Sequence, residues 1–164
     1  MQIETPRLLL VPLTPEHLDL WTRDIPALER ELDCSYQAEP TEGIFRDIVR
    51  GQVTRAQNDP ARYFWHSFWL MLRKADRCVI GSIDFKGVPN AAGEVEIGYG
   101  QAPAFEHRGY MTEAVRAFCA WALEQEGVTH ILAETETDNL ASQRILKRCG
   151  FEEISRAATI WWRL

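Results

Sequence analysis

The chain has 164 residues, about the size of one domain, so one hydrophobic core with a cleft in it is expected. Its composition, 46% apolar and 26% charged, is that of a folded globular protein and excludes a disordered or fibrous chain. The formal net charge of −6 argues against a nucleic-acid binder, which needs a basic face, and weakly favours a cationic partner such as an amine.

The sequence gives no sign of a membrane span, an export signal or a metal site. The longest apolar stretch, Phe64 to Leu72, contains His66 and Ser67 and is too short to span a bilayer. Met1 to Arg7 lacks the basic and then apolar stretch of an export signal, so we expect a cytoplasmic protein. The four cysteines and four histidines lack the spacing of a zinc site or redox pair, which predicts no metal.

The first third of the chain predicts a strand followed by two helices. Arg7 to Leu13 is an apolar run typical of a strand. Thr14 and Pro15 suit the cap and the first turn of a helix, which we expect to continue through Leu28. After a polar stretch, another helix is expected around Ile44 to Gln57.

Three antiparallel strands are expected in the middle of the chain. Phe64 to Arg73 and Cys78 to Lys86 are rich in aromatic and β-branched residues, and the short polar turn between them is typical of a hairpin. Gly87 to Gly93 has the composition of another turn, and Glu94 to Tyr99 then alternates with period two. This pattern predicts a third consecutive strand, the fourth of the chain.

The clearest helical pattern begins at Met111. Apolar residues recur from there at three- and four-residue steps, and Gly127 occupies a position typical of a helix C-cap. His130 to Thr135 is then expected to form a short strand. Asn139 is a good N-cap for a last helix over Leu140 to Cys149.

The chain end completes the expected sheet. Phe151 to Leu164 supplies the last strand or a tight hairpin, although it looks short for a full two-strand hairpin. The order strand-helix-helix-strand-strand-strand-helix-strand-helix-strand describes one mixed α/β sheet, and residues 1–164 are expected to form a single domain. An unpaired edge at this end would leave room for a partner subunit, so a homodimer stays open.

The segment Glu106 to Thr112 carries the most chemical information. It joins a strand to the start of the clearest helix, and Gly109 lets the backbone approach a ligand closely. The free N–H groups of a first helical turn, together with the helix dipole, form an anion site that suits a pyrophosphate. Taken alone, the segment is also compatible with a plain loop. No Gly-Lys-Ser/Thr phosphate loop and no Gly-x-Ser-x-Gly elbow occurs, which disfavours nucleotide hydrolysis and serine-hydrolase chemistry.

A series of short motifs makes a family resemblance specific. In order they are Gly81-Ser82-Ile83, Val95 to Tyr99, Pro103, Arg108 to Ala114, Ala133-Glu134-Thr135, and Asn139-x-x-Ser142 leading to Gly150-Phe151. The series resembles the GNAT superfamily of acyl-CoA N-acyltransferases, and most closely its ribosomal-protein N-terminal alanine acetyltransferase branch. The resemblance implies a single α/β (α+β) domain with a mixed, mostly antiparallel sheet, a splayed central strand pair and about four helices.

The resemblance also implies the reaction and the cofactor. The chain is expected to move the acetyl group of acetyl-CoA to a primary amine, on a small molecule or a protein N-terminus, by direct attack in a ternary complex. The cofactor-binding residues that it implies are Ile97, Gly98, Tyr99, Gly100, Gln101, His107, Arg108, Gly109, Tyr110, Met111, Thr112, Asn139 and Ser142. Glu106 and Met111 depart from the usual ends of the family motif, and Arg108 is expected to supply the charge that Glu106 lacks.

The resemblance implies a general base for the ammonium proton and an acid for the leaving thiolate. Glu96 is the candidate base. Glu96 lies on the opposite strand face from Val95 and Ile97, so it could take the ammonium proton, or it is a plain strand carboxylate. Amides near Gly98 to Gly100 are the implied oxyanion donors. Asp84 and Glu134 are further strand carboxylates that could contact a cationic acceptor.

The acid that protonates the leaving thiolate departs from the usual family pattern. Many family members carry a Tyr on the last helix, where this chain has Leu146. Ser142 is the implied substitute, or it is a first-turn serine that satisfies free amides. Asn139 is a helix cap, a cofactor contact or both.

The acceptor amine cannot be identified from the sequence. The acceptor site is expected to be shaped by Trp21 to Asn58 and by the chain end near Trp161 and Trp162, the segments in which the family pattern has the fewest motifs. An acyl-CoA-binding sensor or subunit of the same fold, without turnover, is the alternative function.

Overall fold

The computed structural model describes residues 1–164, which form one nine-stranded sheet in the order β1-β2-β4-β5-β6-β7-β9-β8, with β3 paired beside β5. The strands are β1 (Ile3–Glu4), β2 (Leu8–Pro12), β3 (Ser35–Tyr36), β4 (Phe68–Arg73), β5 (Cys78–Phe85), β6 (Glu94–Gln101), β7 (His130–Glu136), β8 (Glu152–Arg156) and β9 (Thr159–Arg163). The α-helices are α1 (Pro15–Arg23), α2 (Ile25–Leu32), α3 (Gly43–Asn58), α4 (Tyr110–Leu123) and α5 (Leu140–Arg148), and the 3₁₀ turns are η1 (Pro60–Trp65) and η2 (Pro103–Phe105).

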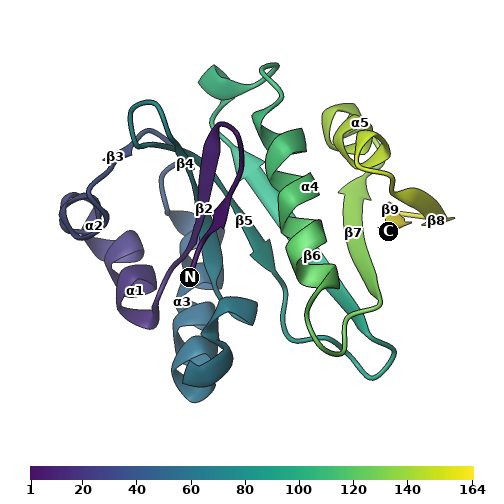
Figure 1. Ribbon diagram of the computed structural model, residues 1–164, viewed down its shortest axis with the longest axis horizontal. Helices are drawn as coiled ribbons and strands as arrows, with labels where there is room; N and C mark the ends of the chain where they lie inside the picture. Colours follow the sequence, from purple (N-terminus) through teal and green to yellow (C-terminus); the bar gives the residue numbers. More distant parts are fainter.

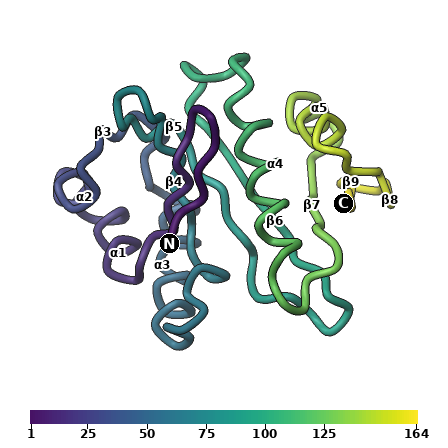
Figure 2. The backbone as a smooth tube through the Cα atoms, viewed as in Figure 1, coloured from purple at the N-terminus to yellow at the C-terminus, as the bar shows by residue number.

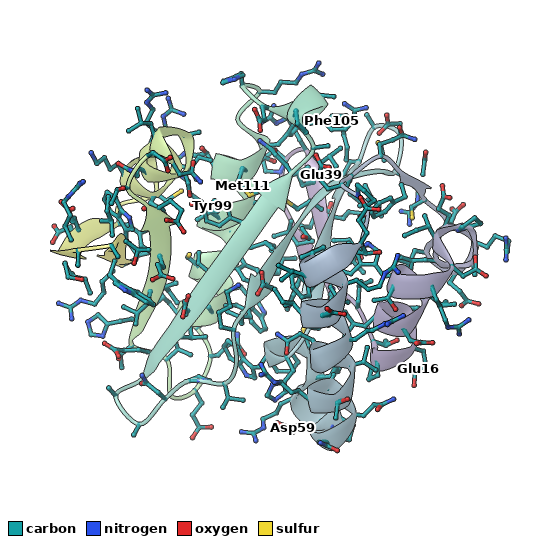
Figure 3. All side chains as sticks on the ribbon, turned by 180° about the vertical axis from the view of Figure 1, so that it is seen from behind. Glu16, Glu39, Asp59, Tyr99, Phe105 and Met111 are labelled. Carbon is teal, nitrogen blue, oxygen red and sulfur yellow. The ribbon has the colours of Figure 1, made fainter.

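The helices lie in two layers, one on each face of the sheet. Helix α4 crosses the front of the sheet in Figure 1, and α3 lies in front in the opposite view of Figure 3. Under α4 the core includes Phe85 and Phe118, whose rings stack with centroids 4.0 Å apart. On the other face, Leu18 and Val49 from the helices pack with Phe68 of β4. Helices α1 to α3 cover only the N-terminal half of the sheet. On the same face, β6 and β7 therefore carry polar side chains that no helix covers, among them Glu96 and Glu134.

The predicted order of strands in the middle of the chain is confirmed, with shifted boundaries. Strands β4, β5 and β6 pair antiparallel in succession. Strand β4 begins at Phe68 and not at Phe64, because Pro60–Trp65 forms a 3₁₀ turn in which Pro60 occupies the first turn. Strands β1 and β3, of two residues each, carry no sequence signal long enough to predict them.

The first helical stretch is two helices, so the domain has five α-helices where about four were expected. The break falls at Asp24, whose φ of −151° is not helical and whose carboxylate accepts the N–H of Ala27 at 3.0 Å. Asp24 thereby ends α1 and caps α2, with Pro26 in the first turn of α2. The predicted cap at Thr14 is confirmed by its bond from the His17 N–H.

Two predictions about the second half of the chain are wrong. Helix α4 ends at Leu123 with Glu124 as its C-cap, so Gly127, at φ 82°, belongs to the following turn. Phe151 to Leu164 is long enough for a full hairpin, because β8 and β9 have five residues each and pair antiparallel. Strand β9 pairs with β7, so β8 becomes the edge of the sheet.

The predicted splay of the central strand pair is confirmed. Strands β6 and β7 are parallel and pair only over Glu94–Ile97 and His130–Ala133. Beyond these residues β6 continues beside β5 and β7 continues beside β9. The two strands diverge toward α5 in Figures 1 and 2. This opening is where the candidate site lies.

Candidate active site

The end of β6 presents backbone groups that no strand satisfies. Lys86 donates its N–H to the Glu96 carbonyl at 2.9 Å, and Ala102 donates to the Ile80 carbonyl at 3.0 Å, so even-numbered residues of β6 bond to β5. By the alternation of an antiparallel ladder, the N–H groups of Tyr99 and Gln101 point away from β5. Strand β7 has diverged at this level, so both N–H groups face the opening.

The turn before α4 has the geometry of an anion site. His107 and Gly109 both have positive φ, 61° and 78°, which turns the chain sharply into the helix. The first helical bond runs from the Glu113 N–H to the Gly109 carbonyl at 3.1 Å. The N–H groups of residues 110–112 therefore have no partner within the helix and point out of its N-terminus.

The first residues of the chain clamp this turn. Arg7 donates to the Arg108 carbonyl at 2.9 Å and to the Glu113 carboxylate at 2.7 Å, and its guanidinium lies 4.4 Å from the Tyr110 ring centre. Thr5 also donates to Glu113, at 2.6 Å. Partial burial raises the pKa of Glu113, but the hydrogen bonds from Thr5 and Arg7 outweigh it and lower that pKa overall. The turn is thus held in place by charges outside its own segment.

A cavity of about 300 Å³, here called the α5 cavity, lies between the end of β6, this turn and α5. Figure 3 labels two of its residues, Tyr99 of β6 and Met111 of α4. Of the predicted cofactor residues it is lined by Tyr99, Gly100, Gln101, His107, Gly109, Met111, Thr112, Asn139 and Ser142. Ile97, Gly98, Arg108 and Tyr110 do not line it.

Positive charge reaches the α5 cavity from residues that sequence reasoning missed. Arg144 and Arg148 lie one helical turn apart on α5 and both line the cavity, beside Glu106. Arg148 also lines a neighbouring hollow with Arg7 and Arg116, next to Gly109. The four-residue spacing of the two α5 arginines, following the cap at Asn139, was the signal available in the sequence. These two cations line the cavity beside Glu106, whereas Arg108, which was expected to supply the charge, does not.

Ser142 does not cap α5 with its hydroxyl. The cap is Asn139, whose side-chain oxygen accepts the Ser142 backbone N–H at 3.1 Å. The Ser142 hydroxyl lies 2.8 Å from the Tyr99 hydroxyl, across the opening from β6. Burial raises the pKa of Tyr99 to about 12, against a lowering by the bond with Ser142, so the phenol stays protonated. The two hydroxyls form a pair on the wall of the α5 cavity.

A second cavity of about 320 Å³, here called the α3 cavity, lies on the other side of β6. Its wall is aromatic, with Trp21, Phe45 and Phe68 packed edge to face at centroid distances of 5.4 to 5.5 Å. Glu39 lines it as well, and Figure 3 labels Glu39 across β6 from Tyr99. The lining includes residues of Trp21 to Asn58, one of the two segments predicted to shape the acceptor, but neither Trp161 nor Trp162 of the other segment.

The two cavities share the last three residues of β6, Tyr99, Gly100 and Gln101. The Gln101 side-chain oxygen is buried there and accepts no hydrogen bond from the protein. A group that entered from the α5 side and one that entered from the α3 side would therefore meet at the same unpaired strand end.

Glu96 lies half-buried near the α3 cavity but lines neither cavity. Partial burial raises its pKa, Lys86 lowers it, and Glu134 and Asp84 raise it, with a net increase. Asp84 does line the α3 cavity and is almost completely buried. Glu134 is exposed and accepts the Thr159 hydroxyl at 2.7 Å. The role predicted for Glu96 stays a prediction.

The structure contains no group of three or more His, Cys, Asp or Glu side chains placed to hold a metal ion. None of its helices combines the length and the apolar character needed to cross a membrane.

The family model and the similar proteins all indicate the same family of acetyltransferases. The family model described as "Acetyltransferase (GNAT) domain" matches residues 7–152. The Bacillus subtilis protein YjdG, named an uncharacterized N-acetyltransferase, is 31% identical over 153 residues, which cover 87% of this chain and 90% of YjdG.

Solved structures show the same fold. The ribosomal L7/L12 alpha-N-protein acetyltransferase RimL, in complex with coenzyme A, superposes with a TM-score of 0.72 at 15% identity, covering 100% of this chain and 97% of RimL. The ribosomal-protein-S5-alanine acetyltransferase of Vibrio fischeri gives a TM-score of 0.71 at 14% identity, covering 100% of this chain and 96% of its own. At such identities the likeness establishes the fold alone.

Proposed function

Because the chain belongs to the GNAT acetyltransferase family, we propose that this acetyltransferase takes its acetyl group from acetyl-CoA and passes it to a primary amine by direct attack in a ternary complex. The observation that carries the proposal is the meeting of two cavities at one strand end. The α5 cavity would hold the donor, the α3 cavity would hold the acceptor, and Tyr99, Gly100 and Gln101 belong to both.

The residues of the α5 cavity fit acetyl-CoA. The pyrophosphate would lie on the free N–H groups at the start of α4, near the cations Arg144 and Arg148. The pantetheine arm would follow the unpaired edge of β6, where the N–H groups of Tyr99 and Gln101 have no strand partner. The unbonded Gln101 side-chain oxygen offers an acceptor for an amide N–H.

When bound, acetyl-CoA supplies an activated thioester whose carbonyl carbon is open to attack by a neutral amine. The free N–H groups at the end of β6 would stabilise the negative charge that then develops on the carbonyl oxygen. The Ser142 and Tyr99 hydroxyls, 2.8 Å apart, would deliver a proton toward the leaving sulfur. Glu96 lines neither cavity, so as a base it would have to act through an intervening water.

Two measurements test the proposal. Calorimetry with EDTA present should show acetyl-CoA binding at one site per chain. A panel of primary amines, including peptides with free N-terminal alanine or serine, should then release the CoA thiol in a protein-dependent way. Tight binding with no thiol release on any amine would instead support the acyl-CoA sensor, and no binding would remove both functions.

A further inference from the structure

The α3 cavity contains a buried carboxylate oxygen to which the protein gives a long ion pair and no hydrogen bond of good geometry. Asp84 of β5 lines the cavity and is 3% exposed. Its Oδ2 atom is buried and accepts no hydrogen bond. The nearest cation is Lys86, whose Nζ lies 3.4 Å from Oδ2 and whose side chain is 49% exposed. A buried charge with such weak compensation is costly, and costs of this kind are concentrated at functional sites.

The neighbouring strand leaves space for this carboxylate. Gly98 of β6 lies directly opposite Asp84 in the antiparallel register. A Cβ atom on Gly98 would come within 2.9 Å of Asp84 Oδ1 and 2.6 Å of Lys86 Nζ. The glycine therefore keeps open a space on the strand face that a larger residue would fill. Asp84 occupies this space, opposite the residue that directly precedes the shared end of β6.

We propose that Asp84 binds the ammonium group of the acceptor in the α3 cavity and receives its proton, and that the acceptor is a compact amine carried on an apolar or aromatic body. The inference rests on the proposed function and adds the identity of the proton acceptor and the substrate class. It assigns to Asp84 the role that the family resemblance assigned to Glu96.

The wall of the cavity supports this substrate class. Trp21, Phe45 and Phe68 present aromatic surface, and the half-exposed Ile48 continues it toward the mouth. Tyr36 is fixed in the wall because its hydroxyl accepts from the Trp21 ring N–H at 2.9 Å and donates to the Glu39 carbonyl at 2.6 Å. Aromatic faces attract both apolar groups and cations. A volume of about 320 Å³ is at the low end for ligand sites, which favours a compact acceptor.

The proton balance of the step is complete with these groups. The ammonium nitrogen gives one proton to Asp84 Oδ2, and its lone pair then forms a bond to the thioester carbonyl carbon. As the tetrahedral intermediate collapses, the C–S bond breaks and the nitrogen loses a second proton. The sulfur leaves with one proton delivered through Ser142 and Tyr99, and the other proton is released to solvent. The products are an amide, CoA thiol and one proton.

The charged groups around Asp84 set its basicity. Burial raises the pKa of the Asp84 carboxyl, and Lys86 opposes that increase without cancelling it. A carboxylate with a raised pKa is a stronger base for an ammonium proton than an exposed one. The other charged groups near it are Glu96 of β6, Asp47 and Arg55 of α3, and Glu39 after β3, and Glu134 of β7 lies beyond Glu96.

The test is the pH profile of Asp84→Asn with an amine that the wild-type protein acetylates. Near pH 7 almost all of an alkyl amine is protonated, so turnover of the variant should fall by about 100-fold or more. The deficit should shrink as pH rises toward the amine pKa, while the acetyl-CoA Kd from calorimetry stays at the wild-type value. The variant is isosteric, and an unchanged or higher melting temperature shows that it is folded.

Two further variants make the result specific. Glu126→Gln removes an exposed carboxylate in the turn after α4 that lines neither cavity, and it should keep wild-type turnover. Glu96→Gln tests the competing base and should lose less activity than Asp84→Asn at every pH. A larger loss in Glu96→Gln, or a deficit of Asp84→Asn that is constant with pH, would overturn the role of Asp84.

Substrate class is tested with Phe45→Ala, which removes part of the aromatic wall. KM should rise by about 10-fold for arylalkyl and alkyl amines, which should be better substrates of the wild type than polyhydroxylated amines. Preference for polyhydroxylated amines, or an unchanged KM in the variant, would overturn the class. Wild-type protein that acetylates no amine would instead refute the proposed function, so the two failures are distinguishable.

Discussion

The two cavities on either side of β6 are built by different means. The α5 cavity takes its anion site from backbone N–H groups in one short segment, and side chains of the neighbouring α5 complete it. The α3 cavity is lined by residues of α1, α3, β3 and the loop after it, β4, β5 and the shared end of β6. A site made of backbone depends on the glycines and caps that set the backbone conformation, so it leaves a recognisable local pattern in the sequence. A site made of scattered side chains has no local pattern, and it can change its ligand by changing a few of them.

The largest effect is expected from Gly109→Asp, which changes the backbone anion site of the α5 cavity and leaves the α3 cavity intact. A carboxylate at the helix N-terminus would repel the pyrophosphate, so we expect acetyl-CoA affinity to fall by about 100-fold or more in calorimetry. Gly109→Asn is the matched control, because it carries the same left-handed backbone strain at φ 78° without the charge. If both variants bind acetyl-CoA like the wild type while folded, the turn does not belong to the site.

Ser142→Ala tests the hydroxyl pair on the wall of the α5 cavity. Turnover should fall by about 10-fold with little change in acetyl-CoA affinity, because the hydroxyl would act on the leaving sulfur. The melting temperature should not change, since Asn139 caps α5 through the backbone N–H of residue 142, which alanine retains. Tyr99→Phe should give a similar loss and add little in the double variant. Loss of stability with normal specific activity would contradict this role.

Gly98→Ala is expected to affect the acceptor side alone. Its methyl group would meet the mobile end of Lys86 and the buried Asp84 carboxylate, so the acceptor KM should rise by several-fold, on the order of 1 kcal/mol. Acetyl-CoA affinity should stay at the wild-type value, because Gly98 does not line the α5 cavity. A change in both constants would show that the two cavities are not independent across β6.

The smallest expected effect is thermal and pH-dependent. Burial raises the pKa of Asp84 despite Lys86, so the folded protein keeps this proton to a higher pH than the unfolded chain does. The destabilisation is therefore absent below the unfolded pKa of about 3.9, and it grows as the pH rises toward the folded pKa. Asp84→Asn should melt a few degrees above the wild type at pH 7, since about 1 kcal/mol shifts Tm by roughly 2–4 °C at this size. The difference should vanish near pH 4, and a lower Tm at pH 7 would show that the ion pair with Lys86 is structural.

The sequence predicted those parts of the fold and site that rest on local signals. The cap at Asn139, the turn at Gly109 and the alternation of β6 are local, and the structure contains all of them. The break at Asp24 is also local, but the apolar spacing through Leu28 continues across it and hides the cap that its carboxylate provides. The contact of Arg7 with the turn joins residues far apart in the chain, so no spacing rule could predict it.

The choice between the strand carboxylates shows the same limit within the site. Glu96 and Asp84 lie on adjacent strands and face the same side of the sheet. Glu96 lies within the family motif Val95 to Tyr99, and Asp84 directly follows the motif Gly81-Ser82-Ile83. Which of them reaches the α3 cavity depends on Gly98 and on the packing of α3, which are properties of the assembled sheet. Alternation alone assigns a strand face and cannot assign a cavity.

The clamp between Arg7 and Glu113 also bears on the order of events during synthesis. The two residues are 106 positions apart, so Arg7 leaves the ribosome several seconds before Glu113 is made, at about 5–20 residues per second. The turn at Gly109 therefore receives its final geometry only when two-thirds of the chain is present and the first strands have docked. Acetyl-CoA, if it binds the completed turn as proposed, would then stabilise finished chains over incomplete ones by mass action. In a cell, the supply of the donor molecule would thus influence how much of this enzyme survives to work.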